Sequence, residues 1–161
     1  MRTILAIFAL VGWTTTAGAQ EWVLGAGYAD FSNRASQDQA MIALEYHRDP
    51  FYSRGRLQVG VSAAVDADTS GDLFVGIGLG GVYDLNGRWF LEGSVLPGAF
   101  FEAVAQNDLG STFEIRSLLG VGYVLASGTR ISLALSHKSN AGTASVNPGL
   151  NSVLIRWRRR F

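Results

Sequence analysis

The chain has 161 residues, enough for one domain, and its 13 basic and 13 acidic side chains give a formal net charge of zero. That balance excludes the basic excess of a nucleic-acid-binding protein, and the absence of cysteine excludes disulfide scaffolds, thiol catalysis and Cys-based zinc sites. Only 16% of the residues are charged, 20 are glycine and two are histidine. This composition favours many short strands in a membrane and leaves little for a metal site.

The first 19 residues predict a secretion signal. Arg2 is a short positive region, residues 3–13 are apolar, and Ala17-Gly18-Ala19 has the small-residue pattern of a cleavage site. The apolar run is shorter than the roughly 20 residues that a spanning helix needs, so a membrane anchor is the less favoured alternative. We expect cleavage between Ala19 and Gln20, which leaves residues 20–161 as the folded domain.

Hydrophobic residues in the domain alternate with a period of two, which is typical of strands with two different faces. In chain order the pattern predicts eight strands: 21–31, 40–47, 55–66, 72–84, 89–101, 112–126, 129–138 and 151–161. Short turns (48–54, 85–88 and 126–129) alternate with longer polar connections (31–39, 66–72, 102–111 and 138–150). This rhythm predicts an all-β fold, an eight-stranded antiparallel up-and-down transmembrane β-barrel of the outer-membrane type.

Each predicted strand has an aliphatic face and a face of small, polar or charged residues. The charged and polar face carries Glu45, Arg56, Gln58, Glu92, Glu114, Arg116, Arg156 and Arg158. We expect these residues to fill and pair within a narrow lumen, because side chains fill an eight-stranded barrel. Aromatic residues near the strand ends predict interfacial girdles: Trp22, Tyr28, Tyr46, Trp89 and Trp157. A soluble secreted barrel with its apolar face inward is the alternative.

One cluster of residues has the composition of a catalytic site. Short turns should face the periplasm and long loops the exterior, which places the end of segment 129–138 at the level of the outer leaflet. His137 and Ser139 are two residues apart and share the lipid-facing side with Leu135, and Asn151 shares that side on the last strand. Serine as nucleophile, histidine as general base and a third group that orients the imidazole make up an esterase triad.

Residues 136–161, SHKSNAGTASVNPGLNSVLIRWRRRF, resemble the lipid A 3-O-deacylase (PagL) family. The resemblance implies an eight-stranded outer-membrane barrel whose triad opens at the outer leaflet. By position, it makes His137 the base, Ser139 the nucleophile and Asn140 an oxyanion-hole donor, with backbone N–H groups of Ala141 and Gly142 as further donors.

The sequence departs from the family at the third member of the triad. The family's glutamate falls 14 positions after the histidine, where this chain has Asn151. An amide oxygen can orient the imidazole but cannot stabilise imidazolium with a full charge. Glu114 shares the lumen-facing side with Arg116, whereas Glu102 and Asp108 lie in a long loop from which they could reach the site.

The sequence therefore predicts an outer-membrane esterase that removes the 3-O-linked hydroxyacyl chain of lipid A in the outer leaflet, without cofactor or metal. The alternatives are a catalytically inactive small barrel, either adhesin or membrane-stabilising, and an esterase acting on another membrane lipid. We expect no chemistry from His47, from the glycine-rich segment 76–81, which lies within a strand, or from Asn147-Pro148-Gly149, which shapes the last loop. The basic run 156–160 is expected to pair in the lumen and at the periplasmic rim.

Overall fold

A computed structural model of the chain describes residues 20–31 and 38–160. The predicted signal peptide and the terminal Phe161 lie outside these residues. Nine strands are present in the described ranges: β1 (Glu21–Phe31), β2 (Gln39–His47), β3 (Tyr52–Arg54), β4 (Leu57–Asp68), β5 (Leu73–Asp84), β6 (Trp89–Phe101), β7 (Phe113–Val124), β8 (Arg130–Ser139) and β9 (Leu150–Arg160). A short 3-10 helix, η1 (Ala105–Asn107), lies between β6 and β7. No helix in the described part of the chain is long and apolar enough to span a membrane.

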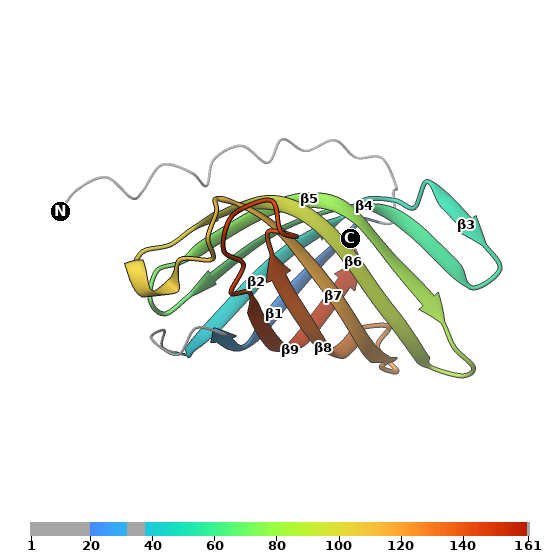
Figure 1. Ribbon diagram of the computed structural model, residues 1–161. Coiled ribbons are helices and arrows are strands. Elements are labelled where there is room, and N and C mark those ends of the chain that lie inside the picture. Colours follow the sequence, from blue (N-terminus) through green and yellow to red (C-terminus); the bar gives the residue numbers. More distant parts are fainter. Residues whose placement is uncertain (1–19, 32–37, 161) are drawn as a thin grey trace, which may run out of the picture.

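The eight long strands close into an antiparallel barrel, as predicted (Figure 1). Neighbours in the chain pair with each other, and the barrel closes where β1 pairs with β9. The connections 102–112 and 140–149 lie at one end, called here the loop end. The opposite end, called the turn end, carries β3 and the turns that follow β5 and β7.

The connection 48–54, predicted as a turn, instead contains β3. This strand pairs with the beginning of β4, with Tyr52 opposite Val59, and the hairpin projects from the turn end (Figure 1). Its three residues are all exposed, so they give no alternation by which a strand could be recognised. The prediction that Arg56 points into the lumen is also wrong, because Arg56 is exposed in the turn of this hairpin.

The two faces of the strands are as predicted. Ile155 is 71% exposed, while its neighbours Leu154 and Arg156 are 0% and 2% exposed. All around the barrel, aliphatic side chains lie on the outer face and charged side chains lie in the lumen. The soluble-barrel alternative is therefore wrong, because such an exterior is stable in contact with lipid and not with water.

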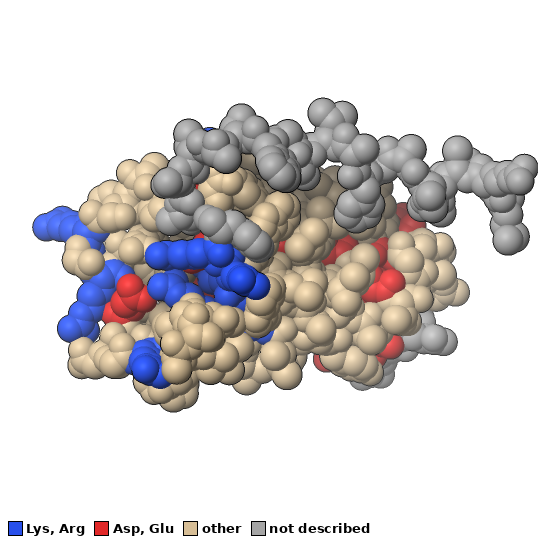
Figure 2. Space-filling model, turned by 180° about the vertical axis from the view of Figure 1, so that it is seen from behind, with Lys and Arg blue, Asp and Glu red and all other residues tan. Residues whose placement is uncertain are grey.

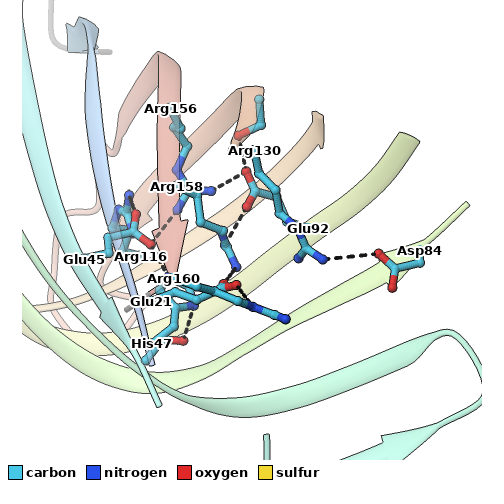
Figure 3. Close-up of polar contacts among 12 residues, drawn as sticks. Glu21, Glu45, His47, Asp84, Glu92, Arg116, Arg130, Arg156, Arg158 and Arg160 are labelled. Atoms are coloured by element: carbon cyan, nitrogen blue, oxygen red, sulfur yellow. Dashed lines mark hydrogen bonds and ion pairs between the residues drawn. The ribbon is translucent and has the colours of Figure 1, made fainter. Parts of the chain in front are cut away.

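Ion pairs run through the lumen from the turn end toward the loop end. Nitrogen–oxygen distances of 2.5 to 3.1 Å link residues of alternating charge into one series. In order, the members are Lys138, Asp66, Arg116, Glu45, Arg156, Glu92, Arg158, Glu21 and Arg160. Figure 3 shows the part around Glu45 and Glu92, with His47 bonded to Glu45. Pairing offsets the cost of burying each charge, and the barrel is packed rather than open.

Apolar side chains occupy the lumen toward the loop end, where Phe74, Phe100, Leu109 and Leu150 are buried together. Most exposed basic side chains lie at one end of the barrel and most exposed acidic ones at the other (Figure 2). Exposed arginines belong to the turn end: Arg48, Arg54, Arg56, Arg88, Arg159 and Arg160. Exposed acids of the loop end are Asp30, Asp38, Glu102 and Asp108. The candidate site lies on the outer wall near this acidic end.

Candidate active site

Strands β8 and β9 position the predicted site residues. His137 and Ser139 lie on β8 with their side chains on the outer face, where His137 is exposed and Ser139 is half-buried. Asn151, on β9, is the direct cross-strand partner of His137 and is also exposed. The outward direction follows from the strand alternation, because the adjacent residues Ser136, Lys138 and Ser152 are buried.

The histidine and the asparagine are joined by a hydrogen bond. His137 Nδ1 and Asn151 Oδ1 are 2.8 Å apart. An amide oxygen only accepts hydrogen bonds, so Nδ1 carries the proton and donates it, and Nε2 is left with a free electron pair. This is the tautomer that a general base needs toward a serine hydroxyl.

Ser139 lies two residues after His137 on β8, on the same face and nearer to the loop end. Across β7 its partner is Ile115. Among the described residues the Ser139 hydroxyl forms no hydrogen bond, so the structure brings His137 and Asn151 together but leaves the contact between Ser139 and His137 to be completed. Hydrogen bonds to a nucleophile are often long without substrate and tighten when it binds.

Asn140 organises the loop that follows β8. Its side chain is fully buried, and its Nδ2 donates to the carbonyl oxygens of Leu109 at 3.2 Å and Val146 at 2.8 Å. Its Oδ1 accepts from the N–H of Gly142 at 3.0 Å, and its own N–H donates to Asn147 Oδ1 at 3.1 Å. The amide predicted to face an oxyanion is thus used within the protein, and the Gly142 N–H is used with it.

Ala141 occupies a backbone conformation that is uncommon for a residue with a side chain. Its φ is +54°, in the left-handed region, and no other non-glycine residue of the described chain has a positive φ. Its N–H forms no hydrogen bond within the described residues, in contrast to the N–H groups of Asn140 and Gly142. Of the predicted oxyanion donors, the Ala141 N–H is therefore the one that a ligand can use.

Gly149 lies directly against the imidazole. Its φ is +75°, and a Cβ at this position would be 3.0 Å from His137 Cε1. The expected loop-shaping role of Asn147-Pro148-Gly149 thus includes a close approach that only glycine allows.

A groove of about 960 Å³ connects His137 and Asn151 with the apolar outer wall. Its aliphatic lining comes from outward-facing residues of five neighbouring strands: Leu79, Val95, Leu119, Leu135 and Val153. Ser117, the cross-strand partner of His137 on β7, lines it as well. An acyl chain is the kind of ligand that matches such a lining.

None of the acidic residues considered from the sequence is the third member of the triad, the group bonded to His137 Nδ1. Glu114 is 0% exposed and faces the lumen, as predicted. Glu102 and Asp108 are exposed in the loop between β6 and β7, while Nδ1 of His137 is bonded to Asn151. Sequence analysis did not single out Ser117 or the outward-facing Asp30, since their proximity to the site depends on strand register.

Comparison with known proteins gives consistent similarities. A family model described as lipid A 3-O-deacylase (PagL) matches residues 8–160. A protein named lipid A deacylase PagL from Bordetella bronchiseptica (strain ATCC BAA-588 / NCTC 13252 / RB50) is 33% identical over 75 residues, which span 46% of this chain and 42% of that protein.

Solved structures show the same barrel. The crystal structure of the outer membrane enzyme PagL matches with a TM-score of 0.68 and 22% identity, over 86% of this chain and 97% of that one. The crystal structure of Neisserial surface protein A (NspA) matches with a TM-score of 0.57 and 13% identity, over 88% and 96% of the two chains.

Proposed function

The chain belongs to the lipid A 3-O-deacylase (PagL) family, and from that membership and the site we propose that it is an outer-membrane serine esterase that removes the 3-O-linked hydroxyacyl chain of lipid A. The observation that carries the proposal is the 2.8 Å hydrogen bond from His137 to Asn151 on the lipid-facing wall. A polar pair on such a surface is costly unless it has a function. Here it prepares an imidazole as a base beside a serine of the same face.

The reaction follows from the positions of these groups. Nε2 of His137 takes the proton of Ser139 Oγ while that oxygen attacks the ester carbonyl carbon. The tetrahedral intermediate collapses as the imidazolium returns the proton to the sugar oxygen, which leaves as the 3-hydroxyl of lipid A. Ser139 now carries the acyl group. A water molecule, deprotonated by His137, then releases the hydroxy fatty acid and restores Ser139.

The Ala141 N–H is the donor that we assign to the developing oxyanion. It follows Ser139 by two residues, and the left-handed φ of +54° at Ala141 is held by the hydrogen bonds of Asn140. Asn140 and Gly142 thus support oxyanion binding through the loop rather than by direct donation. A donor that is fixed before the reaction stabilises charge without reorganising in the transition state.

The groove supplies the substrate side of the proposal. Lipid A is anchored in the leaflet by its acyl chains, so it can reach an outward-facing site by lateral diffusion. Leu135 and Val153 flank His137 and Asn151 in the groove and give an acyl chain an apolar surface. The hydrocarbon next to the scissile ester therefore stays in an apolar environment while the ester meets the polar site.

The proposal is tested with the purified barrel in detergent micelles containing lipid A. We expect release of a hydroxy fatty acid and covalent labelling by a fluorophosphonate at Ser139. Ser139→Ala should abolish both and His137→Gln should reduce both. Lipid A left intact while phospholipid is hydrolysed would indicate the other esterase, and no hydrolysis or labelling by a folded barrel would indicate the inactive one.

A further inference from the structure

A carboxylate stands next to Asn151 on the side away from the histidine. The closure of the barrel pairs β9 with β1 and makes Asp30 the direct cross-strand partner of Asn151. Asn151 is in turn the direct partner of His137 on β8. The three residues form one row across β8, β9 and β1, all exposed on the outer wall and all lining the same groove. Side chains directly opposite each other in antiparallel strands have Cβ atoms about 4.5–5.5 Å apart.

The amide of Asn151 has a different group on each side. Its Oδ1 is bonded to His137 on β8 at 2.8 Å. Nδ2 branches from the same carbon as Oδ1 and forms no hydrogen bond among the described residues, so it can donate toward β1, where Asp30 is the cross-strand neighbour. An ionised carboxylate only accepts hydrogen bonds, and Nδ2 only donates them. The row therefore has a matched order of donors and acceptors from the imidazole to the carboxylate.

We propose that Asp30 is a positioning residue of the esterase: it accepts a hydrogen bond from Asn151 Nδ2 and so selects the amide orientation that gives Oδ1 to His137. This inference rests on the proposed function. Without Asp30 the amide can rotate and present Nδ2 to the imidazole. Nδ1 would then be the acceptor and Nε2 would carry the proton, which is the tautomer that cannot take a proton from Ser139.

Asp30 also supplies charge. The family's glutamate would place a negative charge directly on the imidazole, and Asn151 cannot. Asp30 places a negative charge one strand further from the imidazole. There it stabilises the imidazolium that forms in the transition state. Asp38, another acid of this end, has its Oδ2 bonded to the Tyr28 hydroxyl at 3.3 Å, which occupies it with a different partner.

The test compares Asp30→Asn in two backgrounds. In the natural background we expect kcat and the rate of fluorophosphonate labelling of Ser139 to fall by about tenfold or more. In an Asn151→Glu background a carboxylate reaches the imidazole directly, so Asp30→Asn should leave kcat and the labelling rate unchanged. Glu102→Gln, which removes another exposed charge of the loop end, is the matched control and should leave the rates within about twofold.

An equal loss in both backgrounds would mean that Asp30 acts on folding alone and would overturn the inference, as would an unchanged rate in the natural background. A readout without catalysis separates this from the proposed function. Nitrogen NMR of the two histidines should report Nδ1–H at His137, and Asp30→Asn should shift that residue toward Nε2–H. An unchanged tautomer would overturn the role of Asp30, even in a barrel that hydrolyses no lipid A.

Discussion

Two buried glutamates of the lumen should respond in opposite ways to the loss of their charge. Glu45 is 1% exposed, its Oε1 is 2.7 Å from Arg116 Nη2, and its Oε2 pairs with Arg156 Nη2. Glu114 is 0% exposed, and neither of its carboxylate oxygens has a hydrogen-bond partner among the described residues. Glutamine keeps the shape of both side chains, so the comparison isolates charge and bonding.

The magnitude follows from the contacts. Glu45→Gln leaves only one acceptor oxygen at position 45, where Arg116 and Arg156 each use one, and it turns an amide NH2 toward one of the two guanidinium groups. Removing one partner of a buried ion pair costs about 3–5 kcal/mol. At about 1.4 kcal/mol per factor of ten, that is a loss of roughly 10²- to 10⁴-fold in the folding equilibrium. Glu114→Gln removes a buried carboxylate whose oxygens have no hydrogen-bond partner among the described residues, so the free energy of unfolding should stay the same or rise.

Urea unfolding of the barrel in lipid vesicles measures both effects, with tryptophan fluorescence and the gel mobility of unheated samples as signals. The midpoint should fall strongly for Glu45→Gln and should not fall for Glu114→Gln. Equal destabilisation of the two variants, or a larger loss for Glu114→Gln, would refute the account of the lumen as a paired charge network.

Three further predictions concern the barrel wall and the site. Gly27→Ala should destabilise the barrel by about 1–3 kcal/mol or more, because its Cβ would lie 1.8 Å from a carbonyl oxygen of β9; Gly25→Ala, with its nearest contact at 3.3 Å, should cost less in the same urea assay. Ser117→Trp should lower hydrolysis of long-chain esters about tenfold by filling the groove and leave short-chain esters unaffected, and equal loss for both would contradict the groove. Gly149→Ala should displace His137 and reduce kcat by about 10²-fold in a folded barrel, so an unchanged kcat would show that the close approach is unimportant.

The period-two pattern was sufficient to predict the barrel, because lipid outside and paired charges inside impose opposite chemistry on alternate residues. It missed β3, whose residues are all exposed, and it assigned Arg56 to the lumen by extending the pattern beyond the barrel wall. Alternation along a strand reports which face a side chain takes, but only where the two faces meet different environments.

The contacts of the site could likewise be predicted only in part from the sequence. His137 and Asn151 could be placed on one face and on neighbouring strands from the sequence, and the structure gives the hydrogen bond between them. Asp30 could not be placed beside them, because its neighbour is set by the register in which the first strand meets the last. The hydrogen bonds of Asn140 were also beyond the sequence, since they join the site loop to a loop about thirty residues away.

Mass spectrometry of lipid A from cells that express the chain shows whether it removes the 3-O-linked chain, with Ser139→Ala as the matched control. We expect lipid A from cells with the natural chain to lack one 3-O-linked hydroxyacyl chain and lipid A from the Ser139→Ala cells to be intact. Unchanged lipid A beside a folded, surface-located barrel would contradict this expectation, as would the same loss in the cells that express Ser139→Ala.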